Sequence, residues 1–155
     1  MQPFFEAMLG DKNNTYYLAK FAQLEQKGSG LRPSWHWPAF FFGGIWALYR
    51  KMYGWFAILV GVTILSNALE RAGASAASAL LFIISWFAFA IFANALYKHH
   101  LQKKIEEAKM TITDQGTLMT HLRSKGGVHA WVVWFFVFFA ALGMVAAMLM
   151  PLFVG

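Results

Sequence analysis

The sequence predicts an all-α integral membrane protein with three transmembrane helices. Of its 155 residues, 59% are hydrophobic and only 13% are charged, whereas soluble domains average about 45–50% apolar and about 25% charged residues. Three stretches lack charged side chains: 52–69, 72–97 and 128–154. A helix needs roughly 20 apolar residues to cross a bilayer, so each stretch is a candidate span, and 35–155 is expected to form the membrane domain.

Residues 1–34 are expected to form a cytosolic lead that contains one amphipathic helix. Residues 13–15 carry helix-capping side chains, and Gly28 to Pro33 would end the helix. The apolar side chains between them share one face: Tyr17, Leu18, Phe21 and Leu24. This face docks either on the membrane surface or on the protein's own core, unless the segment is an ordinary surface helix.

Residues 37–50 are predicted to form a short interfacial or re-entrant helix. The apolar run from Trp37 to Tyr49 is too short to cross a hydrocarbon layer, and Pro38 suits the first turn of a helix. Gly43 and Gly44 would allow a bend or a close helix contact. This segment precedes the first predicted span directly.

The second predicted span continues without a helix breaker into a charged stretch. Residues 98–109 are strong helix formers and should project into the cytoplasm, and residues 111–127 read as a polar connector rich in Thr, Ser and Gly. Together, 98–127 are expected to be a cytosolic helical extension and connector.

The distribution of Lys and Arg predicts the orientation of the chain. Residues 1–51 hold six of these cations and residues 98–125 hold another six, whereas the short turn at 70–75 holds only Arg71. Short cytoplasmic loops carry an excess of Lys and Arg. The N-terminus is therefore expected in the cytoplasm and the C-terminus outside.

Two sets of residues are candidate sites. Aromatic and basic side chains near the predicted membrane edge favour the lipid headgroup level, and the basic ones either recognise anionic lipid or act only as the topology signal. The set comprises Trp35, Trp37, Trp46, Arg50, Lys51, Tyr97, Lys98, Lys103 and Lys104. The second set, Asn67 and Asn94, is expected to make polar contacts between helices, with a polar pathway as the alternative.

Several chemistries have no support in the sequence. There is no cysteine, none of the five histidines has the spacing of a zinc-binding HExxH motif, and no ionisable residue lies deep in a predicted span, as proton-coupled carriers usually require. We expect no catalytic residue, cofactor or metal. We also expect no nucleic-acid partner, because no soluble module would carry it.

One stretch resembles a known family. The residues Ala39 to Gly43 (AFFFG), Trp46 and Leu48 to Met52 (LYRKM), followed by Asn94 and Tyr97, resemble the bacterial membrane family of unknown function DUF2628. The resemblance covers roughly residues 16–108. It implies a bacterial inner-membrane setting and no activity, and Gly44 departs from the Pro or Phe typical of the family, so the local bend is expected to differ.

The leading functional hypothesis is a small, non-enzymatic bacterial inner-membrane protein that acts through protein contacts in or at the bilayer. It would be an interaction partner, a regulator or an immunity protein against a membrane-active toxin. Its partners would be the lipid bilayer, including anionic lipid, and another membrane protein. The alternative is a homo-oligomeric pore or lipid-handling unit, and a third hypothesis is a lipid-headgroup enzyme with His99 or His100 as base.

Overall fold

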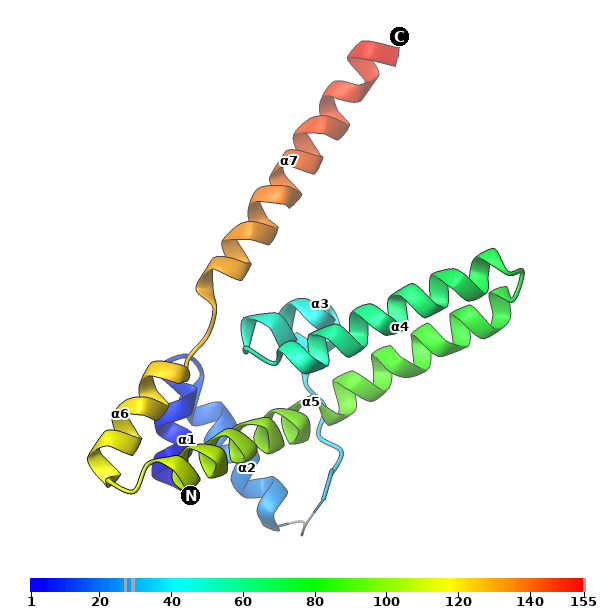
Figure 1. Cartoon of the computed structure of the whole chain (residues 1–155). Coiled ribbons are helices and arrows are strands. Elements are labelled where there is room, and N and C mark those ends of the chain that lie inside the picture. Colours follow the sequence, from blue (N-terminus) through cyan, green and yellow to red (C-terminus); the bar gives the residue numbers. More distant parts are fainter. Residues whose placement is uncertain (27, 29, 155) are drawn as a thin grey trace.

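A computed structural model describes residues 1–26, 28 and 30–154, with side chains in the last helix described as far as Ala147. Within this part of the chain all regular structure is helical (Figure 1). The helices are α1 (Gln2–Leu9), α2 (Asn14–Gln26), α3 (Trp37–Tyr49), α4 (Tyr53–Arg71), α5 (Ser75–Thr111), α6 (Gln115–Lys125) and α7 (Ala130–Val154).

Helices α4 and α5 form an antiparallel hairpin (Figure 1). They are joined by a tight turn in which Gly73 has φ 80°, a left-handed conformation that glycine adopts without strain. Near this turn the Ser78 hydroxyl donates to the Ser66 carbonyl at 2.8 Å. At 1.5 Å per residue, the 37 residues of α5 extend about 55 Å. This helix therefore runs well past the start of α4.

Three helical segments of the described chain are long and apolar enough to cross a membrane: α4, α5 and the segment that contains α7. The bounds of α4 and α7 agree with the first and third predicted spans to within a few residues, whereas α5 begins near the start of the second span and continues past its predicted end at residue 97 to Thr111. The all-helical class is thus confirmed, and the two helices of the hairpin together with α7 correspond to the predicted crossings.

The far half of α5 is the centre of a helical head that also contains α1, α2 and α6. The buried face of α2 consists of Tyr17, Phe21 and Leu24. The ring of Phe21 lies 5.1 Å from that of Phe5 in α1, and the ring of Tyr17 lies 5.1 Å from that of Tyr97 in α5. Of the placements expected for the amphipathic face, the structure therefore shows docking on the protein's own core.

Two helices of the head were not expected from the sequence. The residues 111–127 are not an extended connector, because most of them form α6, and α1 precedes the predicted amphipathic helix. The Asp114 carboxylate caps α6 by accepting from the Thr117 amide at 2.7 Å, and Leu118 and Leu122 bury its inner face. The extension from residue 98 is helical as predicted, but these neighbours cover it, so it does not project freely.

Helix α3 begins at a well-defined cap and is broken in its middle. His36 is the N-cap, and its Nδ1 accepts from the Ala39 amide at 3.0 Å. Gly43 has φ 45° and ψ −118°, outside the helical region, so the bend expected at the glycine pair is present. On the other side of the break, a Cβ at Gly44 would lie 3.3 Å from the Phe56 ring of α4, which shows how closely α3 and α4 approach.

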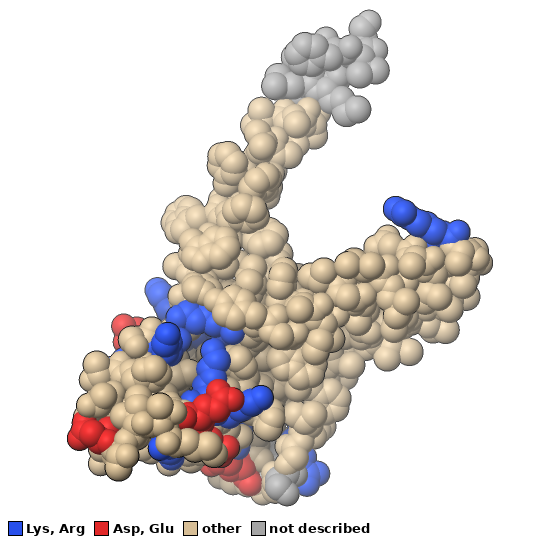
Figure 2. All heavy atoms as spheres, viewed as in Figure 1, with Lys and Arg blue, Asp and Glu red and all other residues tan. Residues whose placement is uncertain are grey.

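Helix α7 rises from the head and diverges from the hairpin along its length (Figure 1). Its base is tied to the end of α3, because the His129 amide donates to the Tyr49 carbonyl at 2.9 Å. Val132 is buried, whereas the remaining side chains from Trp131 to Ala147 are exposed. Charged residues gather on the head, apart from a group at the tip of the hairpin (Figure 2), which contains Arg71.

Candidate functional site

Arg50 lies at the junction of α3 and α4 and is enclosed by aromatic rings. Its guanidinium carbon is 4.4 Å from the ring centre of Tyr17, 5.4 Å from that of Tyr97 and 5.6 Å from that of Tyr49. Both terminal nitrogens donate to the Lys12 carbonyl, at 3.4 and 3.5 Å. Only 2% of Arg50 is exposed, and no carboxylate among the described residues pairs with it. Cation–π attraction, which strengthens on desolvation, therefore replaces an ion pair here.

His36 connects this cluster to the start of α3. Because Nδ1 accepts from Ala39, the neutral ring carries its proton on Nε2, which donates to the Tyr17 hydroxyl oxygen at 3.0 Å. Burial lowers the pKa of His36 to about 4, and the nearby cations Arg50 and Lys20 lower it further. His36 is thus neutral at physiological pH, which suits a buried N-cap beside a cation.

Burial also raises the pKa of Tyr17, although the Arg50 guanidinium opposes that rise. The hydroxyl therefore stays protonated, and the residue contributes a ring face to Arg50 and a hydroxyl to His36. Tyr17 of α2 thus connects His36, at the start of α3, with Arg50, at its end. We call Tyr17, His36, Tyr49, Arg50 and Tyr97 the tyrosine–arginine cluster.

An extended segment, residues 34–36, is fixed to α5 beside this cluster. The Ser34 and His36 amides donate to the carbonyls of Ile91 and Ala90 at 2.8 and 3.0 Å. The Asn94 side-chain amide donates to the Ser34 hydroxyl at 3.1 Å and, more weakly, to the Ser34 and Trp35 carbonyls. Asn94 is fully buried. The two ends of the segment are therefore positioned by hydrogen bonds and not by apolar packing alone.

A second polar feature is a group of cations at the base of α7. The Lys51 ammonium donates to the carbonyls of Lys125 and Gly126 at the end of α6, the former at 3.2 Å. Burial lowers the pKa of Lys104, and the charges of Lys51 and Lys125 lower it further. Burial and the charge of Lys104 lower the pKa of His100 to about 4. The α3–α4 junction, α5 and α6 thus bring positive groups together. We call Lys51, Lys104 and Lys125 the lysine cluster.

The base of α7 is held beside the start of α4. The Tyr53 hydroxyl is hydrogen-bonded to the His129 ring, and these residues stand at the first turn of α4 and just before α7. Lys51 precedes α4 by two residues. The lysine cluster therefore lies where two apolar helices leave the head.

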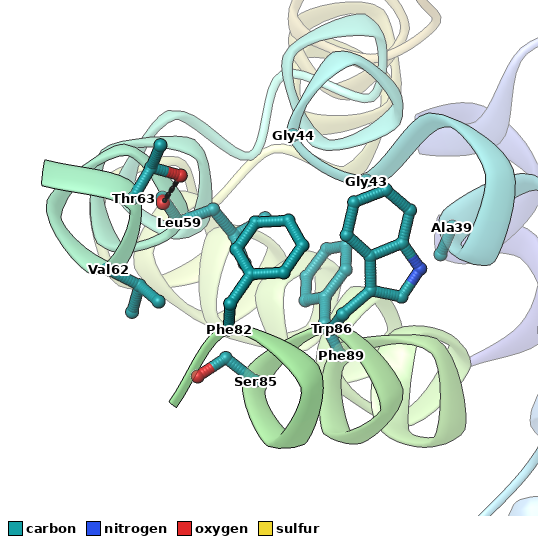
Figure 3. Close-up of a pocket in the computed structure, with 10 residues that line it drawn as sticks. All are labelled: Ala39, Gly43, Gly44, Leu59, Val62, Thr63, Phe82, Ser85, Trp86 and Phe89. Carbon is teal, nitrogen blue, oxygen red and sulfur yellow. Dashed lines mark hydrogen bonds between the residues drawn. The ribbon is translucent and has the colours of Figure 1, made fainter. Parts of the chain in front are cut away.

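A small pocket lies between the break in α3 and the hairpin (Figure 3). It has a volume of about 100 Å³, and the rings of Phe82, Trp86 and Phe89 point from α5 toward α3. Its hydroxyl groups belong to Ser85 and to Thr63, which donates to the Leu59 carbonyl at 3.0 Å. Thr63 is about 15 Å along α4 from Tyr53. The glycine break therefore faces an apolar pocket near the middle of the hairpin's length. None of the residues that line this pocket has a side chain for acid–base chemistry.

The predicted headgroup residues separate into buried and exposed groups. Trp46, Arg50 and Tyr97 were expected to face lipid headgroups, but they are buried among the protein's own side chains, because α2 covers this end of α3 and α5. The Trp46 ring packs 4.7 Å from the His36 ring and 5.9 Å from the Tyr97 ring.

The remaining members of that set are at least partly exposed. Trp37 is 59% exposed and stacks on Phe41, and Trp35 is half-buried against Trp37 and Phe40. Lys98 forms a salt bridge with Glu25 at 3.1 Å, and Lys103 forms one with Glu107 at 4.0 Å. Lys51 and Lys104 are half-buried and form no salt bridge with any described carboxylate.

Neither asparagine makes the predicted helix-to-helix contact. Asn94 bonds to the extended segment before α3, which crosses α5 at that level. Asn67 is exposed and donates to the Thr63 carbonyl of its own helix at 2.8 Å, the usual solution for a polar side chain with no neighbouring helix to bond.

Sequence reasoning missed the parts of both clusters that come from other helices. Tyr17 was read only as part of an apolar face, and Lys125 only as a cation of a connector. One signal was available for His36: a polar side chain followed by Trp-Pro stands at the N-cap position before a proline in the first turn. Among the described residues, no group of three or more His, Asp or Glu is placed to hold a metal.

Comparison with known proteins gives one match. The protein-family model described as "Protein of unknown function (DUF2628)" matches residues 8–103, which confirms the resemblance read from the AFFFG and LYRKM motifs. The matched region contains α2, α3, α4 and most of α5, and thus the whole tyrosine–arginine cluster. Neither the curated proteins nor the solved structures include a match to this chain.

Proposed function

This chain belongs to the DUF2628 family of proteins of unknown function, and from that premise we propose that it is a small, non-enzymatic membrane protein that acts by binding another membrane protein within the bilayer. The observation that carries this proposal is the state of α7. From Trp131 to Ala147 every side chain except Val132 is exposed, and the helix contacts the rest of the chain only near its base.

Exposure alone does not require a protein partner, because lipid tails cover apolar side chains equally well. Two pairs of small residues favour a protein partner over lipid alone. Gly143 and Ala147 are four residues apart on α7, and Ala57 and Gly61 have the same spacing on α4. A Cβ at Gly143 or at Gly61 would meet no atom within 4 Å. Small residues at this spacing let helix backbones approach closely, and neither pair is used for that purpose among the residues that the structure describes.

We further propose that the protein lies in a bacterial inner membrane with its head in the cytoplasm. Twelve of the 13 Lys and Arg residues fall within residues 1–51 and 98–125 of the sequence, against Arg71 at the tip of the hairpin. This distribution supports an N-terminus inside, an outer hairpin tip and a C-terminus outside. Helix α3, with its break at Gly43, would then enter the inner leaflet without crossing it.

The absence of catalysis is part of the proposal and rests on the sequence. The chain has no cysteine, and it contains no sequence motif of a nucleophile, a nucleotide-binding loop or a zinc protease. The two buried polar features that could resemble an active site, His36 and Arg50, are each occupied by structural contacts.

Photo-crosslinking in native membranes tests the proposal. A photoreactive residue at Met144, beside the open face of Gly143, should give a crosslinked product with one other membrane protein. Gly143→Leu, which blocks close approach and meets no atom of its own chain, should remove that product, whereas the control Val145→Leu should retain it. Crosslinks to lipid alone would contradict the proposal. A crosslink to a second copy would favour the alternative, a homo-oligomeric pore or lipid-handling unit.

A further inference from the structure

No salt bridge among the described residues neutralises the lysine cluster. None of Lys51, Lys104 and Lys125 forms a salt bridge with a described carboxylate. The nearest acid that influences Lys104 is Glu107, and the salt bridge of Glu107 is with Lys103. Like charges held together cost free energy unless an anion lies between them.

The cluster is held in place and is not a chance meeting of flexible side chains. The Lys51 ammonium is tied to two carbonyls at the end of α6, and the Lys51 backbone has φ 60°, a left-handed conformation that is uncommon outside glycine. The surrounding fold therefore fixes this conformation. Lys104 and Lys125 line a cleft of about 340 Å³ between α5 and α6, which Glu107 also lines. The cleft is large enough for a phosphate group.

A neutral histidine beside the lysine cluster offers a further polar atom. His100 lies on α5 one turn before Lys104, and its Nε2 is buried without a hydrogen-bond partner among the described residues. The pKa values of His100 and Lys104 are both lowered, in each case first by burial and then by neighbouring cations. An anion at this position would relieve the repulsion that Lys51 and Lys125 exert on Lys104.

The position of the cluster decides which anion is favoured. Lys51 precedes α4 by two residues, and Lys125 precedes α7 by five. If α4 and α7 enter the bilayer where their apolar stretches begin, these lysines lie at the level of the lipid headgroups. Basic residues near a membrane surface attract anionic lipid by about 1 kcal/mol each.

We propose that Lys104 and Lys125, which line the cleft, and the neighbouring charge of Lys51 form a specific site for the phosphate of an anionic phospholipid headgroup. The site differs from the general attraction of a basic head for a membrane, because it uses three lysines that have no salt bridge and leaves out neighbours of equal charge. It is also independent of the proposed protein contact through α7, since it involves no residue of that helix.

The experiment measures lipid retention by the purified full-length protein in detergent micelles, using native mass spectrometry. The probes are phosphatidylglycerol, phosphatidylcholine and inorganic phosphate. We expect one phosphatidylglycerol molecule per chain to be retained at concentrations at which phosphatidylcholine is lost. Lys104→Gln and Lys125→Gln should each weaken this retention at least fivefold.

Neighbouring cations on the same helices provide matched controls. Lys103→Gln, next to Lys104, and Arg123→Gln, on α6 close to Lys125, remove the same charge but should change retention less than twofold. Equal losses for Lys103→Gln and Lys104→Gln would overturn the site in favour of diffuse attraction. Equal retention of both lipids would also overturn it, as would Lys104-dependent binding of inorganic phosphate without lipid. Lys125 is exposed, so Lys125→Gln should fold normally. Its lipid retention therefore tests the site even if Lys104→Gln fails to fold.

Discussion

The guanidinium of Arg50 lies 4.4 Å from the ring centre of Tyr17, and this contact joins the amphipathic helix α2 to the junction between α3 and α4. Arg50 is buried without a carboxylate partner in the described part of the chain. The head and the α4–α5 hairpin are therefore coupled through a cation held by aromatic rings. This relationship gives separate predictions for the ring and the hydroxyl of Tyr17.

Tyr17→Leu should destabilise the head more than Tyr17→Phe. Phenylalanine keeps the ring over Arg50 and loses only the hydroxyl contact with His36, a hydrogen bond worth about 1 kcal/mol. Leucine also removes the ring face, and a desolvated cation–π contact contributes about 2 kcal/mol. Thermal unfolding in detergent, followed by tryptophan fluorescence, measures the difference. Equal losses for the two variants would show that the ring does not stabilise Arg50.

Gly126→Ala should destabilise the head although its backbone conformation suits any residue. A Cβ at this position would lie 2.5 Å from the Met8 carbonyl oxygen and 2.7 Å from its Cα, so α1 and α6 would have to separate. Steric strain of this kind costs about 1–3 kcal/mol. The control is Gly61→Ala, where the new methyl group meets no atom within 4 Å. A Gly126→Ala variant as stable as the control would contradict the close contact between α1 and α6.

The stability of the head should fall as the pH is lowered from 6.5 toward 4. The pKa of His36 is about 4 in the folded protein, below its ordinary value of 6.5, so the unfolded chain binds a proton first. The stabilisation from neutral His36 is fully present above pH 6.5 and is lost as the pH falls through this window. The shift corresponds to at most about 3 kcal/mol.

His36→Asn isolates this effect, because asparagine can cap α3 but does not titrate in this range. His100 contributes a fall in the same window, since its pKa is also about 4. The difference between the parent protein and the variant should therefore shrink as the pH falls from 7 to 4. A difference that stays constant over that range would refute the assignment of a neutral, buried His36.

The sequence predicted the apolar framework well and the head poorly, for physical reasons. A span is a local property of composition, so the uncharged stretches placed α4, the apolar part of α5, and α7 directly. Helix α6 was missed because only Leu118 and Leu122 mark its buried face among polar neighbours. The sequence around α6 does not indicate that this face packs against α1, which is distant in the sequence.

The candidate sites show the same division. Arg50 and Trp46 have the composition of a membrane edge, and their burial depends on Tyr17, which is distant in the sequence. Lys103 and Lys104 are adjacent and equivalent in the sequence, but Lys104 is half-buried in the cleft between α5 and α6, whereas Lys103 is exposed and forms a salt bridge with Glu107. Only the packing of α6 against α5 distinguishes them.

The threading of the chain is the central claim, and cysteine labelling in intact cells tests it most directly. The chain has no cysteine, so single substitutions at two exposed positions, Ala72→Cys at the hairpin tip and Ser124→Cys in α6, report without background. A membrane-impermeant maleimide should label Ala72→Cys in intact cells and should label Ser124→Cys only after the membrane is permeabilised. Labelling of Ser124→Cys in intact cells, with Ala72→Cys protected, would contradict the account.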